Sequence, residues 1–143
     1  MTSDSKKLVE EFIKVVNSHN ANKIISYFSD DGILENVPLG IATHGKEEIT
    51  AYTKTMLIDY PDVNFELKSV FGAGDWAGDE WVMTGTFANN TMSKNAVPAT
   101  GKTFSVRGTS IYKIRNGKFA RESNYYDNVS FLQQVGLMPG RPK

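Results

Sequence analysis

The spacing of apolar residues changes once along this chain, and that change constrains the fold more than any other feature. Before Pro61, apolar side chains recur at helical spacing, as in Leu8–Val16 and Ile49–Tyr60. After Pro61 they alternate with polar residues, which is the two-residue period of a strand whose two faces differ. Because the helices come first and the long strands follow, the pattern predicts an α+β fold and not an alternating α/β fold.

The part before Pro61 predicts three helices and one short strand, separated by turn residues. Asn20 can cap the second helix with its side-chain oxygen. Pro61 ends the third helix, because a proline disfavours the helical conformation of the residue before it. The expected elements, in chain order, are a helix carrying Leu8–Val16, a helix carrying Ile24–Phe28, a turn at Asp30–Gly32, a strand over Ile33–Val37 and a helix over Thr43–Tyr60.

The part after Pro61 predicts long, mainly antiparallel strands. Asn116–Gly117 lies between the last two strands and is typical of a two-residue hairpin turn. A sheet of such long strands must curve strongly to wrap a helix, so we expect a cone whose pocket is closed at one side by the helices. The alternating runs are Val63–Leu67, Trp81–Phe87, Phe104–Ile114 and Lys118–Asp127, and a short helix over Val129–Gly136 follows them.

Charge and composition exclude several classes of function. The chain has 143 residues, with 16 Lys and Arg against 16 Asp and Glu, so it lacks the basic excess of proteins that bind nucleic acid or anionic membranes. It has no cysteine and only two histidines, which argues against a metal centre or a thiolate nucleophile. No apolar stretch approaches the ~18 residues of a membrane span, and the first residues are polar or charged. We therefore expect one cytoplasmic domain over residues 1–143 that binds neither metal, nucleic acid nor membrane.

The hairpin turn allows the residues of the last two strands to be assigned to faces. A two-residue turn pairs Ile114 with Phe119, Tyr112 with Arg121, Ser110 with Ser123, Gly108 with Tyr125 and Val106 with Asp127. This face is mostly apolar or aromatic, which is typical of a pocket wall, and it ends at Asp127. A bulge in either strand would exchange the two faces.

Asp127 has two interpretations. In an apolar pocket, desolvation would raise the pKa of its carboxyl, and the group could act as a general acid or base near neutral pH. Tyr125 and Ser110 could then donate hydrogen bonds to an oxyanion on the substrate. Alternatively, Asp127 caps the final helix, because it directly precedes Asn128. On the residues alone we favour the cap.

Eight segments in order resemble SnoaL-like proteins, the polyketide (ester) cyclases of the NTF2-like superfamily. They extend over nearly the whole chain, from about Leu8 to Pro139, and their order and spacing are more specific than any one of them. The segments are Asn17–Asn20, Tyr27–Gly32, Tyr60–Asp62, Thr84–Thr86, Val97–Lys102, Tyr112–Lys118, Tyr125–Asp127 and Phe131–Pro139. The resemblance implies the same α+β cone, usually as a homodimer.

The resemblance also implies a site. In the cyclases, an aspartate that ends the last long strand acts as general acid/base in an intramolecular aldol closure, without cofactor or metal. Asp127 matches this aspartate, and Tyr125 stands where the cyclases can carry a supporting histidine, so with the resemblance we favour a catalytic Asp127 assisted by Tyr125. The expected substrate-binding residues are Asn36, Trp81, Phe104, Ser110, Tyr112, Arg121 and Ser123.

Three functions remain open. The first is a cofactor-independent enzyme of the lyase or isomerase class that cyclises or isomerises a small hydrophobic, carbonyl-containing, polyketide-like ligand. The second is epoxide hydrolysis, which we rank lower because the inward series offers no second aspartate beside Asp127 and Arg121. The third is a non-enzymatic module that binds a small ligand or only dimerises. The outward face of the last strands, with Ile111 and Tyr126, is the expected interface.

Overall fold

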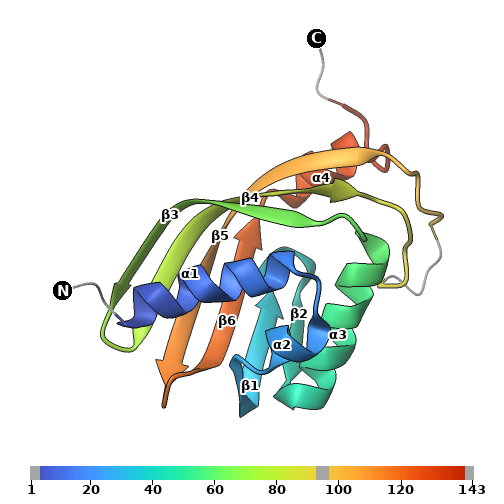
Figure 1. Ribbon diagram of the computed structural model, residues 1–143. Helices are drawn as coiled ribbons and strands as arrows, with labels where there is room; N and C mark the ends of the chain where they lie inside the picture. Colours follow the sequence, from blue (N-terminus) through green and yellow to red (C-terminus); the bar gives the residue numbers. More distant parts are fainter. Residues whose placement is uncertain (1–3, 93–96, 141–143) are drawn as a thin grey trace.

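Three N-terminal helices pack against the inner face of a curved sheet (Figure 1). The computed structural model describes residues 4–92 and 97–140, so residues 1–3, which contributed to the expected localisation, lie outside it. Asn20 caps the second helix as predicted, since its side chain accepts a hydrogen bond from the backbone N–H of Lys23 at 3.1 Å. The helices are α1 (Asp4–Asn17), α2 (Ala21–Ile25) and α3 (Gly45–Asp59), and α4 (Asn128–Gln134) follows the last strand.

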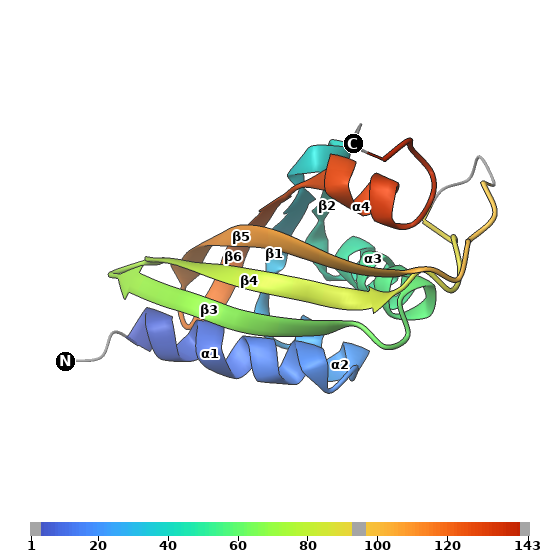
Figure 2. The same cartoon turned by 90° about the horizontal axis from the view of Figure 1, so that it is seen from above.

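The sheet has six strands in the order β2-β1-β6-β5-β4-β3. All neighbouring strands are antiparallel except β1 and β6, which are parallel. Figure 2 shows α1 running along β3. The predicted α+β architecture is therefore confirmed. The strands are β1 (Phe28–Asn36), β2 (Ile41–His44), β3 (Asn64–Ala73), β4 (Trp76–Thr86), β5 (Thr103–Arg115) and β6 (Lys118–Tyr126).

Three register shifts interrupt the ladders, in β1, β3 and β6. The hairpin turn between β5 and β6 has the predicted residues, and Asn116 and Gly117 take positive φ angles of 54° and 72°. Beyond this turn, Ile114 pairs with Phe119 but Lys113 pairs with Arg121, which leaves Ala120 as an extra residue in β6. Such bulges bend a strand and increase its twist, so they contribute to the curvature of the sheet.

Part of the predicted N-terminal half is wrong. Asp30–Gly32 forms part of β1 and not a turn, and Phe28 begins this strand instead of ending a helix. The third helix begins at Gly45 and not at Thr43, because Thr43 pairs with Leu34 in the unpredicted strand β2. A 3₁₀ turn that spans residues 37–39 connects β1 to β2.

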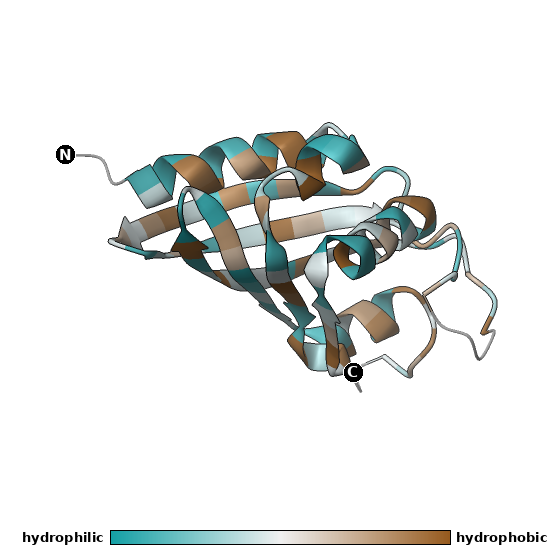
Figure 3. Ribbon diagram, turned by 90° about the horizontal axis from the view of Figure 1, so that it is seen from below, coloured by the Kyte–Doolittle hydropathy of each residue, from teal (hydrophilic) through white to brown (hydrophobic). Residues whose placement is uncertain are grey.

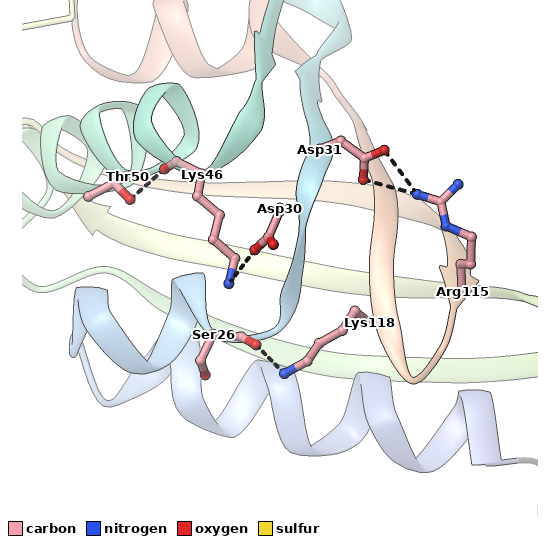
Figure 4. A network of polar contacts seen from close by, with 7 residues as sticks. All are labelled: Ser26, Asp30, Asp31, Lys46, Thr50, Arg115 and Lys118. Carbon is pink, nitrogen blue, oxygen red and sulfur yellow. Dashed lines mark hydrogen bonds and ion pairs between the residues drawn. The ribbon is translucent and has the colours of Figure 1, made fainter.

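Exposed ion pairs surround the irregular start of β1. Asp31 pairs with Arg115 at the end of β5 at 3.0 Å, and Asp30 pairs with Lys46 of α3 at 3.4 Å (Figure 4). All four side chains are well exposed to solvent, so each pair contributes only about 0–1 kcal/mol. These pairs therefore position β1 only weakly, and burial of its apolar side chains holds it in the sheet.

Two apolar clusters fill the inner side of the sheet. The first joins the buried face of α1 to β1, β5 and β6, and the ring of Phe12 meets that of Phe119 edge-on at 4.9 Å. The second joins Phe104 of β5 to Phe131 of α4, also edge-on at 4.9 Å. Hydrophobic and hydrophilic residues alternate around α1 in Figure 3, as its predicted apolar face requires.

Two side-chain amides fix helix ends against strands. Asn17, at the end of α1, accepts from the backbone N–H of Phe65 and donates to the carbonyl of the same residue, both at 2.8 Å. Gln134 of α4 makes the same pair of bonds with Ser105, at 2.7 and 3.0 Å. Each amide satisfies backbone groups as a neighbouring strand would, so α1 is held against β3 and α4 against β5.

Candidate functional site

A cavity of about 490 Å³ lies between the helices and the inner face of the sheet. Its walls are mainly apolar and aromatic and come from both core clusters. A cavity of this size and character suits a small organic ligand. The side chains that give it polarity lie on β1, α3, β5 and β6, and they include Asn36, Tyr52, Ser110, Glu122, Asn124 and Tyr126.

Glu122 is the one carboxyl group among the described residues that line this cavity, and none of those residues is Lys, Arg or His. It lies on β6, opposite Tyr112 of β5, and the residue is 8% exposed to solvent. Burial raises the pKa of the Glu122 carboxyl to about 8, against a hydrogen bond from Asn124 that lowers it, and the nearby Asp79 carboxylate raises it further. Glu122 is therefore mainly a neutral acid at pH 7 and releases its proton slightly above.

A chain of hydrogen bonds leads to Asn124, beside Glu122. The indole N–H of Trp81 donates to the hydroxyl of Ser110 at 2.9 Å, and that hydroxyl donates to the side-chain oxygen of Asn124. Because this oxygen is already occupied, the Asn124 amide group is the end that bonds Glu122. Gly108 makes room for the chain, since a Cβ there would lie 2.3 Å from the Trp81 ring.

Asn36 of β1, which pairs with Asn124 of β6, holds two tyrosines at the same cavity. Its amide nitrogen donates to the Tyr52 hydroxyl at 2.8 Å, and the Tyr126 hydroxyl donates to its oxygen at 2.9 Å. Since the Tyr52 oxygen accepts this bond, its own proton is directed elsewhere, and it has no acceptor in the part of the chain that the structure describes. Burial raises the pKa of Tyr52, so the hydroxyl stays protonated and can donate to a ligand.

Four of the predicted substrate-binding residues, Asn36, Trp81, Ser110 and Tyr112, line this cavity. Phe104 does not line it and instead packs in the second apolar cluster. The structure therefore brings together the predicted residues of β1, β4 and the second half of β5.

The predicted facing of β6 is wrong. Ala120 is an extra residue, so every later side chain of the strand takes the opposite face from the one we expected. Arg121, Ser123 and Tyr125 pair with Lys113, Ile111 and Thr109 on the outer face of the sheet, and none of the three lines the cavity. Glu122, Asn124 and Tyr126 take the inner face, and sequence reasoning missed all three as site residues.

Asp127 lies after β6 and is exposed. Its carboxylate accepts a hydrogen bond from the backbone N–H of Ser130 at 2.9 Å, which is the helix-capping contact of α4. Its side chain does not line the cavity. The catalytic role expected of Asp127 stays a prediction, and its position gives that role no support.

Among residues 4–92 and 97–140, no three His, Asp or Glu side chains come together as they would to hold a metal ion. Within the same ranges, every helix is too short or too polar to cross a membrane.

The chain belongs to the SnoaL-like domain family, whose sequence model matches residues 9–122. This confirms the resemblance noted in the sequence. The match includes β1–β5 and ends at Glu122 within β6.

Solved structures share the whole fold. A proposed polyketide cyclase from Xanthomonas campestris pv. campestris has a TM-score of 0.81 at 20% identity over 92% of this chain and 96% of that one. A proposed polyketide cyclase from Pseudomonas putida gives 0.80 at 24% identity over 94% and 98%. A protein from Catenulispora acidiphila with a ketosteroid isomerase-like fold, in complex with trimethylamine, gives 0.78 at 22% over 99% and 100%. These likenesses confirm the NTF2-like cone.

Proposed function

We propose that this protein is a cofactor-independent enzyme that moves a proton on a small hydrophobic carbonyl compound, with Glu122 as general acid and base. The observation that carries the proposal is a buried carboxyl in a cavity whose described lining holds no basic residue. Without a cation to stabilise its charge, such a carboxyl exchanges its proton near neutral pH. A group tuned in this way is suited to proton transfer at carbon.

The proposed reaction begins with ionised Glu122. Its carboxylate removes a proton from the carbon next to the substrate carbonyl, and the electrons of that C–H bond move to the carbonyl oxygen to form an enolate. The Tyr52 hydroxyl, which has no acceptor in the described chain, donates a hydrogen bond to that oxygen. In a cyclisation, the enolate carbon attacks a second carbonyl of the same molecule, and Glu122 returns its proton to the new alkoxide. In an isomerisation, Glu122 returns the proton to another carbon of the enolate.

The class of substrate follows from the cavity walls. Rings such as those of Phe12, Phe65 and Trp81 line the cavity, and they favour an apolar, flat or cyclic ligand. Their apolar surface also excludes water, which strengthens the hydrogen bond to the enolate oxygen. Two similar solved structures are proposed polyketide cyclases, which agrees with a polyketide-like carbonyl substrate.

The dependence of kcat/KM on pH tests this proposal. Since the base is the ionised form of Glu122, kcat/KM is expected to rise about tenfold per pH unit below pH 7 and to level off above an apparent pKa of about 8. The measurement is a screen of cyclic and linear diketones, followed by a pH–rate profile on any compound that turns over. A profile that is flat between pH 6 and 9 contradicts the role of Glu122. Compounds that bind tightly and are never converted favour the alternative, a ligand-binding module.

Epoxide hydrolysis gains no support from the cavity. Its expected Asp–Arg–Asp arrangement needs an arginine and two carboxylates facing the ligand. Arg121 lies on the outer face of the sheet, and Glu122 is the one carboxyl among the described lining residues.

We also propose that the outer face of the sheet forms a homodimer. Phe71 and Trp76 are exposed on it, and Lys113 lies 4.5 Å from the centre of the Trp76 ring. Arg121 is on the same face and has a buried Nε without a partner in the described chain. Tyr126, which we expected on this face, points into the cavity instead.

Sedimentation velocity tests the dimer. The wild-type protein is expected to have the mass of two chains, and Trp76→Glu is expected to reduce it to one, because a charge would be buried at the interface. Val129→Glu on α4 also changes an exposed apolar residue, and it should leave the mass unchanged. A wild-type protein that sediments as one chain at tens of micromolar excludes this interface.

A further inference from the structure

Asp79 is a buried carboxyl that the proposed reaction does not use. It lies on β4, is 0% exposed and does not line the cavity. Its two oxygens accept one hydrogen bond each, from the Tyr112 hydroxyl and from the backbone N–H of Ser110, both at 3.0 Å. A buried carboxylate is costly unless it is hydrogen-bonded, and both donors belong to β5, which forms a wall of the cavity.

The bond from Tyr112 fixes which way this hydroxyl points. Its proton is committed to Asp79, so the lone pairs of the Tyr112 oxygen are what remains for other contacts. Tyr112 is paired directly with Glu122 across the ladder between β5 and β6. A neighbouring oxygen that can only accept favours a protonated partner over an ionised one.

The bond from Ser110 fixes the other neighbour of Glu122. Asp79 holds the Ser110 backbone, and the Ser110 hydroxyl accepts from Trp81 and donates to Asn124. From Trp81 through Ser110, each side chain therefore donates toward Asn124, and the Asn124 amide is the last donor before Glu122. Glu122 therefore has a donor on one side, the Asn124 amide, and an acceptor on the other, the Tyr112 oxygen. This arrangement matches a neutral carboxyl, which has one O–H to donate and one oxygen to accept.

We propose that Asp79 is a positioning residue, which holds Tyr112 and Ser110 so that Glu122 remains a neutral acid until base or a ligand removes its proton. This inference rests on the proposed role of Glu122. It adds to that role a group that, together with burial, helps to set the pH range in which the proton is exchanged.

The charges around the pair agree with this role. The titratable groups that interact with Glu122 are Asp79 of β4, Tyr112 of β5 and Tyr52 of α3, and Tyr126 of β6 lines the same cavity. On its buried face, α1 contributes the apolar residues Val9, Phe12, Ile13 and Val16. Burial raises the pKa of the Asp79 carboxyl to about 6, and its bonds from Tyr112 and Ser110 oppose the rise. Between about pH 6 and 8, the pair therefore carries one negative charge, on Asp79.

The test is a carboxyl-detected NMR titration of Glu122 without substrate, assigned with Glu122→Gln. In Asp79→Asn, the pKa of Glu122 is expected to fall by about one unit or more. The substitution removes the negative charge of Asp79, and it releases the Tyr112 hydroxyl from the carboxylate that keeps its oxygen an acceptor toward Glu122. Glu80→Gln is the matched control, since Glu80 is the next residue of β4, is exposed on the outer face and bonds Ser69. In this control the pKa of Glu122 should not change.

A second variant covers the case in which Asp79→Asn does not fold. Tyr112→Phe removes the bond to Asp79, so Asp79 keeps its proton to higher pH and the pKa of Glu122 is again expected to fall. An unchanged Glu122 pKa in the variant that folds overturns the role of Asp79. That result would leave the role of Glu122 untouched, because the titration needs no turnover. Full turnover by Glu122→Gln would instead remove the proposed function and leave the titration result standing.

Discussion

Glu122→Gln is expected to lower kcat on a carbonyl substrate by about 10²–10⁴-fold, the usual contribution of a positioned general acid or base. Glutamine has nearly the same shape as the neutral carboxyl and can still accept the hydrogen bond from Asn124 through its side-chain oxygen. It cannot exchange a proton. The fold should therefore be retained, and the loss should appear in kcat more than in KM.

Asp127→Asn is the matched comparison, because it neutralises the carboxylate that the sequence favoured. Asparagine is as good a helix cap as aspartate, so the contact with the Ser130 N–H can be kept. We expect kcat of this variant to stay within about twofold of wild type. The opposite outcome, full loss in Asp127→Asn and full activity in Glu122→Gln, would restore the catalytic role first expected of Asp127.

The second large effect is on stability. The folded protein keeps a proton on Glu122 up to about pH 8, whereas the unfolded chain releases it near 4.5. Between these values the folded state binds more protons than the unfolded state, so the free energy of unfolding falls as pH rises. The expected loss from Glu122 is of the order of 5 kcal/mol, complete above about pH 8. Urea unfolding at a series of pH values measures it.

Glu122→Gln separates this loss from other sources. The variant should be more stable than wild type above about pH 8, because it has no carboxyl to ionise in the cavity. Its free energy of unfolding should still fall by a smaller amount as the pH rises to about 6, because burial also raises the pKa of Asp79. If the free energy of unfolding changes with pH in the same way in the two proteins between pH 5 and 9, Glu122 is not desolvated.

The succession of helices and long strands was predictable because it depends on local spacing. The period change at Pro61 and the Asn116–Gly117 turn are both local signals, and both were confirmed. Strand β2 was not predicted, since its four residues gain their pairing from β1 and carry no alternating pattern long enough to recognise. The start of β1 was likewise not predictable, because Asp30–Gly32 has the composition of a turn and is held in the strand by its neighbours in the sheet.

The site was less predictable, because one residue decides it. Strict alternation counted forward from the hairpin turn places Arg121, Ser123 and Tyr125 inside, and the extra Ala120 places Glu122 inside instead. No local sequence pattern predicts that bulge. The bulge is visible in the structure, where Phe119 and Glu122 are both buried although they lie three residues apart, which a regular alternation does not allow. The capping role of Asp127, in contrast, could be read from Asn128 and the helical residues after it.

The central claim is that the carboxyl of Glu122 is desolvated in the cavity, and its titration in the wild-type protein tests this most directly. Carboxyl-detected NMR, with Glu122→Gln for assignment, reports the pH at which that one group loses its proton. Our account predicts a midpoint near pH 8. A midpoint near the ordinary value of 4.5 would mean that Glu122 is solvated or paired with a cation, and it would contradict the proposed acid/base role.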